Sequence, residues 1–421
     1  MAIAGERERP HDPERSWYAF AEAMTMQLPQ IEARSRPDGP RADWADLAKG
    51  LCIILVVLWH VIMKHYLQID WHIPVPLPGA WGTFGEQLLP LRMPVFFTIS
   101  GMFAAAAVQR PWRVVRRSRI ATFYYLYAIW FTVHTVVLAI VPRFDTLAAH
   151  SILDVLQQLT VTPTNLWYLS ALAVYFVIAK ATRRLPTTVV LSAAFVLSAA
   201  ASAGLLAGPG NRGQMYQNLL FFLAGLRLKP WVERLAAAST PPLVIVGGLG
   251  YLGFMALLQV LGARQWFGVW PVAGALAVML GVAGAAQLQR WRWLARRLTR
   301  LGRRTLPIYV IHMPLLALLH WALLGPFSRL GTPAQLVLAT VLPAALTAVI
   351  IWLSLLLHRA LTRTGASWLF ALPAPRPVQG QPSWMDEPTQ VLPVLWADEP
   401  TRVLPVVRAR KPARVPATVP R

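Results

Sequence analysis

Long apolar stretches alternate with short polar segments along most of the chain. Each stretch holds about twenty residues, which is the length that a helix needs to cross the hydrocarbon core of a bilayer. The stretch at residues 215–228 is short, and Pro186 barely separates the stretch that ends at residue 182 from the one that begins at residue 187. Nine or eleven crossings are therefore alternatives to ten. The pattern predicts an all-α, polytopic membrane bundle of about ten transmembrane helices. We expect them at 47–65, 88–108, 120–141, 166–182, 187–207, 215–228, 241–261, 268–287, 305–325 and 334–357.

The composition supports a membrane protein and excludes several kinds of site. Hydrophobic residues make up 56% of the 421 residues and charged residues 14%, whereas charged residues are about a quarter of an average soluble chain. Cys52 is the single cysteine, which excludes a disulfide framework and a multi-cysteine zinc site. No phosphate-binding glycine loop, serine nucleophile elbow or His-Glu metal motif occurs at a position where it would indicate a functional site. We therefore expect no metal ion and no permanently bound cofactor.

The net charge of +22 is typical of a chain that binds nucleic acid, but its distribution along the chain favours another interpretation. The loops 109–119, 180–184, 227–234 and 290–304 together carry eighteen Lys and Arg, whereas the intervening loops carry four, or five with Lys64. Short basic loops stay in the cytoplasm. We therefore expect a multi-pass protein of the plasma membrane, bacterial in origin, with both termini in the cytoplasm and no nucleic-acid partner.

The two ends differ in composition from the apolar region. Residues 1–46 are polar and predict a cytoplasmic arm, residues 47–358 form the expected transmembrane domain, and the Pro-rich segment 371–421 predicts a disordered cytoplasmic tail. The tail contains a twelve-residue repeat in which Thr389 and Thr401 each follow Asp-Glu-Pro. Either threonine is a candidate phosphorylation site for a Ser/Thr kinase, and a slipped duplication in low-complexity sequence is the alternative.

Ionisable residues inside an apolar span are costly, so each is a candidate functional residue. Lys49 and His60 are eleven residues apart, which places them on one helix face at a distance of about 16 Å. Asp46, three residues before Lys49, is positioned to pair with it. His134, His312 and His320 also lie in spans, and we expect them to satisfy contacts in the core.

Arg92 is expected at the same depth as His60, on the outer side of the membrane. Pro94 removes one backbone hydrogen bond nearby and predicts a kink that opens space between the two helices. The pair predicts an outer-leaflet pocket with His60 as the base and Arg92 as the cation for an oxyanion or a carboxylate. The alternatives are an interhelical hydrogen bond for His60 and extension to the interface for Arg92.

Several segments resemble the motifs of a known family. Asp46-Leu47-Ala48-Lys49-Gly50 followed by His60, the segment from Arg92 to Phe96-Phe97-Thr98-Ile99-Ser100-Gly101, and Arg116-Arg117-Ser118-Arg119 resemble the acyltransferase-3 family of integral membrane O-acyltransferases. Weaker similarities are Asn165-Leu166-Trp167-Tyr168-Leu169, Phe221-Phe222-Leu223-Ala224-Gly225 and Leu306-Pro307-Ile308-Tyr309-Val310-Ile311-His312. The resemblance covers residues 41–360.

The resemblance implies an enzyme that moves an acyl group, expected to be acetyl, from cytoplasmic acyl-CoA to a hydroxyl of a cell-surface glycan or lipid. Lys49, Arg116 and Arg119 would then hold the phosphates of CoA, and His60 would carry the transfer. The distance of about 16 Å from Lys49 to His60 is comparable to an extended pantetheine arm. Two departures are Lys49, where many members have Arg, and Arg113, which offers a second register for the Arg-x-x-Arg motif.

Two points of mechanism and function stay open at this level. His60 could act as a base for direct transfer or could accept the acyl group itself. A transporter or flippase that exports a glycan or lipid intermediate is the alternative function, although no convincing repeat relates 47–207 to 215–357. A kinase-regulated membrane scaffold is a third class, which depends only on the repeat in the tail.

Overall fold

The structure, a computed structural model, describes residues 43–141, 144, 149 and 151–373. Within these residues every regular element is a helix, and none is a strand. The prediction of an all-α protein is thereby confirmed. Most of the predicted arm and tail, with Thr389 and Thr401, lies outside the described residues, so those predictions remain predictions.

Each apolar stretch expected from the sequence coincides with a helix. These helices are α2 (Asp43–Lys64), α4 (Leu89–Gln109), α6 (Thr122–Ile140), α8 (Trp167–Ala181), α9 (Thr187–Ser202), α10 (Arg212–Arg227), α12 (Pro241–Val260), α13 (Val269–Leu288), α15 (Thr305–Ser328) and α16 (Thr332–Arg363). Between them lie the shorter helices α3 (Leu77–Gln87), α5 (Trp112–Val115), α7 (Ile152–Thr160), α11 (Lys229–Ala237) and α14 (Arg292–Gly302).

The lengths of the helices bear on how many of them cross a membrane. Among the described residues, seven helical segments are long and apolar enough to cross one. The helices α8, α9 and α10 have 15, 16 and 16 residues, and at 1.5 Å per residue they reach only about 22–24 Å. The hydrocarbon core is about 30 Å thick. The count of about ten crossings and the cytoplasmic position of both termini therefore stay predictions.

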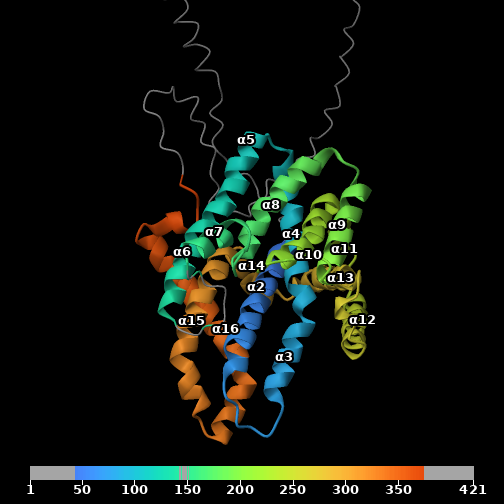
Figure 1. Cartoon of the computed structure of the whole chain (residues 1–421). Coiled ribbons are helices and arrows are strands. Elements are labelled where there is room, and N and C mark those ends of the chain that lie inside the picture. Colours follow the sequence, from blue (N-terminus) through green and yellow to red (C-terminus); the bar gives the residue numbers. More distant parts are fainter. Residues whose placement is uncertain (1–42, 142–143, 145–148, 150, 374–421) are drawn as a thin grey trace, which may run out of the picture. The chain divides into compact units, whose positions relative to one another are not determined.

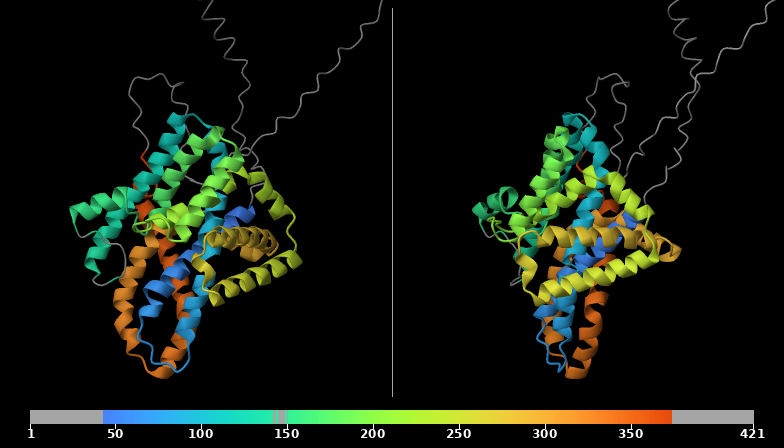
Figure 2. Two further views of the ribbon diagram at one scale, coloured as in Figure 1. Left: turned by 45° about the vertical axis from the view of Figure 1, so that its right-hand side comes forward. Right: turned by 90° about the vertical axis from the view of Figure 1, so that its right-hand side faces the viewer.

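Helix α2 is surrounded by other helices of the bundle. It packs against α4, α13, α14, α15 and α16, and Figure 1 shows α15 and α16 beside it. Helices α12 and α13 pack against each other and run across the direction of α2 and α4 (Figure 2). Since α2 carries both Lys49 and His60, these neighbours define the surroundings of both side chains.

Two glycines allow the backbones of α2 and α14 to touch. A Cβ atom at Gly50 would overlap the carbonyl oxygen of Leu298, and one at Gly302 would overlap the carbonyl oxygen of Asp46. Small residues are the usual means by which helices in membranes approach this closely. The contact brings the start of α15, which begins three residues after Gly302, to the first turns of α2.

A second close crossing joins α4 to α10. A Cβ atom at Gly225 would overlap the carbonyl oxygen of Thr98, and one at Gly101 would overlap that of Phe222. This crossing fixes the position of α4, the helix that carries Arg92.

Ionised side chains surround the contact between α2 and α14. Lys49 Nζ lies 2.7 Å from Asp46 Oδ1 and 4.6 Å from the ring centre of Phe103. Arg303, just after α14, places Nε 3.0 Å from Asp46 Oδ2 and Nη2 3.1 Å from Asp43 Oδ1. The Lys49 side chain has no exposed surface, so Asp46 compensates a cation that water cannot reach.

The glycine contact generates a stability prediction for Gly50→Ala. In most helix interiors Gly→Ala is stabilising by up to about 1 kcal/mol, but here the added methyl group meets the backbone of α14 and should destabilise by about 1–3 kcal/mol. The measurement is the thermal unfolding midpoint of the purified protein in detergent. Gly253→Ala in α12 is the control, because a Cβ atom there has no neighbour within 4 Å. Equal midpoints for the two variants would contradict the argument.

The ion pair generates a second prediction, for Asp46→Asn. This change leaves the buried ammonium of Lys49 without its carboxylate, and breaking a buried pair from one side costs about 3–5 kcal/mol. Thermal unfolding should show a large loss of stability for Asp46→Asn and a partial recovery in the double variant Asp46→Asn with Lys49→Met. The prediction fails if the double variant is the less stable of the two.

Candidate functional site

Helices α2 and α15 each present one face to a common interior. On α2 the residues Lys49, Ile53, Val56 and His60 are spaced by four, three and four positions, and on α15 Thr305, Tyr309 and His312 are spaced by four and three. Residues at such spacings lie on one face of a helix. Because α2 and α15 pack against each other, the two faces can build one site.

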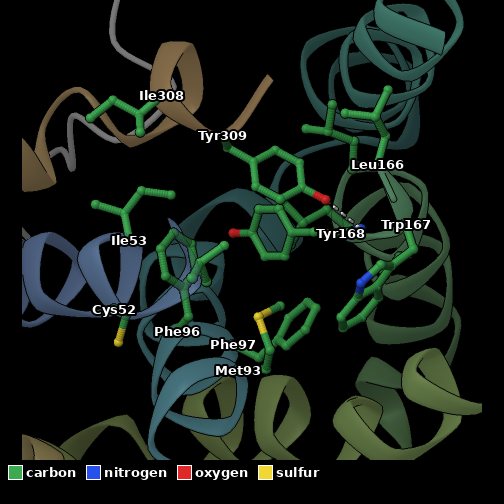
Figure 3. Packing of buried hydrophobic residues seen from close by; sticks show 14 of the residues in the cluster. Cys52, Ile53, Met93, Phe96, Phe97, Leu166, Trp167, Tyr168, Ile308 and Tyr309 are labelled. Carbon is green, nitrogen blue, oxygen red and sulfur yellow. Dashed lines mark hydrogen bonds between the residues drawn. The ribbon is translucent and has the colours of Figure 1, made fainter. Parts of the chain in front are cut away.

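A narrow apolar pocket lies between these faces. Its volume is about 20 Å³, and Figure 3 shows several of its aromatic and aliphatic side chains converging from different helices. Neither His60 nor Arg92 lines it, so it is not the outer-leaflet pocket expected between them. Along α2 it lies one turn before His60, on the side of Lys49. The lining residues are Ile53, Val56, Met93, Phe96, Phe123, Tyr168, Leu169, Thr305, Leu306 and Tyr309.

Two of the three weaker sequence similarities, Asn165–Leu169 and Leu306–His312, supply part of the wall of the pocket. Tyr309 Oη donates a hydrogen bond to the carbonyl oxygen of Asn165 at 2.9 Å. It also accepts one from the backbone N–H of Tyr168 at 3.2 Å, which Figure 3 shows. The hydroxyl groups of Tyr168 and Ser100 lie 2.9 Å apart. These bonds connect α15, α8 and α4, so the wall is held by polar contacts behind its apolar surface.

His60 pairs with a second histidine one helical turn beyond the pocket. His312 Nε2 lies 3.2 Å from His60 Nδ1, and the ring centres are 5.1 Å apart. His60 Nδ1 also lies 2.9 Å from the carbonyl oxygen of Val56, and His312 Nδ1 lies 2.7 Å from that of Tyr309. Val56 and Tyr309 line the pocket, so each histidine follows a lining residue by one helical turn.

The role of His312 was incompletely predicted from the sequence. It does satisfy core contacts, as expected, through the carbonyl oxygens of Tyr309 and Ile308. Its Nε2 atom, however, is turned toward His60, which α2 supplies from 252 positions away in the chain. The one signal was its position at the end of the Leu306–His312 similarity, on the same face as Thr305 and Tyr309.

Arg92 is buried beside the residue that precedes His60. Its guanidinium carbon lies 4.7 Å from the ring centre of Trp59, and the residue is 6% exposed, so it does not extend to the interface. Its Nε and Nη1 atoms are buried and have no hydrogen-bond partner. A buried cation with unsatisfied donors is well suited to an anionic group that forms or binds nearby.

The three residues expected at the CoA phosphates differ in exposure. Arg116 is exposed, at the start of the π-helical turn η2 (Arg116–Ala121). Arg119 is half-buried over Phe176, at 6.0 Å from the ring centre, one turn before the lining residue Phe123. Lys49 is fully buried and engaged by Asp46. Their role as phosphate ligands stays a prediction.

The remaining buried histidines make contacts within the core. His134 Nε2 lies 2.8 Å from the carbonyl oxygen of Val310. His65, just after the end of α2, faces His320 of α15 with their Nδ1 atoms 3.2 Å apart, which forms a second histidine pair. In the described part of the chain, no group of three or more His, Cys, Asp or Glu side chains could hold a metal ion.

Comparisons with known proteins identify the family of the chain. A family profile described as "Acyltransferase domain" matches residues 42–359, which contain α2, α4, α15 and all the lining residues of the pocket. The inner membrane protein YcfT of Escherichia coli strain K12 is 26% identical over 351 residues, covering 79% of this chain and 96% of its own length. No solved structure matches the chain significantly. The profile covers well over half of the chain, and the protein therefore belongs to the acyltransferase-3 family of membrane proteins.

Proposed function

We propose that the protein is a multi-pass enzyme of the bacterial plasma membrane that takes an acyl group, acetyl in the simplest case, from cytoplasmic acyl-CoA. It passes the group to a hydroxyl of a cell-surface glycan or lipid. The observation that carries the proposal is the apolar pocket between α2 and α15, whose lining residues Val56 and Tyr309 each lie one helical turn before a member of the His60–His312 pair. Membership of an acyltransferase family supports the class of reaction.

The pocket lies along α2 between the residue expected near the phosphates of the donor, Lys49, and the residue expected to carry the transfer, His60. Its lining residues on α2, Ile53 and Val56, lie between Lys49 and His60 on one helix face. Eleven residues of helix span about 16 Å, which is comparable to an extended pantetheine arm. At about 20 Å³ the pocket is narrow, so the arm would enter as the lining side chains move apart.

Thr305 offers a polar contact inside this apolar wall. The residue is 1% exposed and its Oγ1 atom has no hydrogen-bond partner. A buried unsatisfied hydroxyl costs about 1–3 kcal/mol, and an amide group of the pantetheine arm would satisfy it.

The phosphates of the donor would bind where the cationic side chains are accessible. Arg116 is exposed and Arg119 lies one turn from the pocket residue Phe123. Arg side chains suit phosphate because their donors match its oxygens in pairs. Lys49 would take part only after its ion pair with Asp46 opens.

The transfer would use the groups that lie beyond the pocket, His60 and Arg92. In the direct route His60 takes the proton of the acceptor hydroxyl while the oxygen attacks the thioester carbonyl carbon. Arg92 stabilises the negative charge that develops on the carbonyl oxygen. The carbon–sulfur bond then breaks, and His60 returns the proton to the departing CoA thiolate. In the second route His60 Nε2 attacks the carbonyl carbon, the carbon–sulfur bond breaks and CoA thiolate leaves. The acceptor hydroxyl then attacks the acyl-histidine, its proton passes to the thiolate, and His60 is regenerated.

A transporter or flippase is less favoured, since the family profile describes an acyltransferase domain. The two functions differ in whether the donor is consumed. An exporter would move its cargo without splitting acetyl-CoA, whereas an acyltransferase releases one free CoA thiol for each group transferred.

The first functional prediction concerns His60→Ala. Losing a general base or nucleophile should lower the rate of acetyl transfer by about 10²- to 10⁴-fold. The assay is release of CoA thiol by the purified protein in lipid nanodiscs, supplied with acetyl-CoA and an extract of cell-envelope glycans and lipids. Unchanged thermal unfolding and acetyl-CoA binding would show that the variant is folded. A folded variant with the wild-type rate would refute the proposed role of His60.

The second prediction concerns the pocket and uses two neighbouring positions of α2. Val56→Phe adds volume to the pocket wall and should lower kcat/KM for acetyl-CoA at least about tenfold, because the donor can no longer lie in line with His60. Leu55→Phe adds a ring at the next residue, which does not line the pocket, and should leave kcat/KM within about twofold of wild type. Equal effects of the two variants would argue against entry of the donor through this pocket.

A further inference from the structure

We propose that His312 is a positioning residue that, together with the carbonyl oxygen of Val56, holds the His60 ring with its hydrogen on Nδ1 and its lone pair on Nε2. The inference rests on the proposed function, because it matters only if His60 acts as a base or nucleophile. It gives His312 a role that the family profile and the relative do not describe.

The contacts of His60 determine where its proton lies. Its Nδ1 atom is 2.9 Å from the carbonyl oxygen of Val56, and a carbonyl oxygen only accepts hydrogen bonds. Nδ1 must therefore carry the hydrogen. In the neutral ring the other nitrogen, Nε2, then holds the lone pair, and this is the atom free to take a proton or to attack a carbonyl.

The contacts of His312 are complementary to this arrangement. Its Nδ1 atom faces two carbonyl oxygens, of Tyr309 at 2.7 Å and of Ile308 at 3.1 Å, and so carries the hydrogen. In the neutral ring Nε2 is then an acceptor, and it faces His60 Nδ1 at 3.2 Å. When both rings are neutral, the hydrogen on His60 Nδ1 is shared between the carbonyl oxygen of Val56 and the Nε2 atom of His312. The opposite tautomer of His60 would place two lone pairs against each other.

A neutral acceptor differs from the carboxylate that often orients a catalytic histidine. A carboxylate in an apolar site holds its histidine in the protonated state, which could no longer accept a proton. The charged or titratable groups that act on the pair are Arg92 from α4, Lys64 on α2 and His134 from α6. No carboxylate is among them within the described structure, so the ring stays available as a base, and His312 accepts from the imidazolium when it forms.

The second histidine pair provides a matched control. His65, the residue that follows α2, also contacts α15, with its Nδ1 atom 3.2 Å from Nδ1 of His320. His320 lies eight residues, about two helical turns, beyond His312 and does not line the pocket. His320 is 7% exposed and His312 1%. If a histidine pair only holds the helices together, the loss of either pair should have the same effect on activity.

The experiment compares three variants of the full-length protein in nanodiscs. His312→Leu fills the space but has no acceptor and should lower kcat by about 10- to 100-fold, with KM for acetyl-CoA within about twofold. His312→Gln places an amide oxygen near the former Nε2 position and should recover at least about a third of the wild-type kcat. His320→Leu should leave kcat within about twofold of wild type while lowering the unfolding midpoint.

Two results would overturn the inference. One is equal activity of His312→Leu and His312→Gln, and the other is equal loss of kcat in His312→Leu and His320→Leu. If His312→Leu does not fold, ¹⁵N NMR of histidine-labelled wild-type protein replaces it. With His60 identified by its absence in His60→Gln, that spectrum must show Nδ1 protonated and Nε2 unprotonated, and the reverse pattern would equally refute the proposal.

If His60→Ala keeps the wild-type rate, the proposed function fails whatever the result at His312. If His60→Ala is inactive and His312→Leu is fully active, the proposed function stands and only the positioning role is lost.

Discussion

The cation of Lys49 is buried in an apolar bundle, and the first turns of α2 depend on how that charge is compensated. An ammonium group without exposed surface requires a carboxylate close by, and Asp46 supplies it at 2.7 Å. Asp46 is itself held by Arg303, which the contact of the two glycines, Gly50 and Gly302, brings within reach. The packing of two backbones and the pairing of ions thus support each other.

This constraint extends to the candidate site through the geometry of two helices. Gly302 lies at the end of α14, and α15 begins three residues later at Thr305. Fixing the start of α15 against the start of α2 sets the register of the two faces that enclose the pocket. One further turn along each helix, the same register brings His312 to His60. A shift of one residue on either helix would turn the ring of His312 away by about 100°.

How much the sequence could predict depends on whether a feature lies within one helix or between two. The pairing of Asp46 with Lys49, and the shared face of Lys49 and His60, follow from the helical period and are present in the structure. The partner of His60 could not be predicted, because the rotation of α15 about its own axis is set by packing across the bundle. The count of crossings also stays open, since α8, α9 and α10 are apolar but short.

The basic loop 290–304 shows why charge counting alone is incomplete. From the sequence its arginines predict orientation, and that prediction treats them as equivalent. In the structure Arg303 is committed to Asp43 and Asp46, whereas Arg297 lies over Trp293 with its guanidinium carbon 4.6 Å from the ring centre. The amino-acid type gives the sign of the charge, and the side chains that surround it, on its own helix or on a neighbouring one, determine which contact the charge makes.

The ion cluster at the start of α2 has a consequence for the electric field around the protein. Its two carboxylates, of Asp43 and Asp46, match the two cations, of Lys49 and Arg303, so the cluster as a whole is electroneutral. A neutral group of charges produces a field that falls off within a short distance. Lys49 therefore contributes little to attracting a polyanion from solution, although its motif resembles the one expected to hold the phosphates of CoA. Long-range attraction on this side of the molecule must come from exposed arginines such as Arg116, whose charges no carboxylate compensates in the described ion pairs.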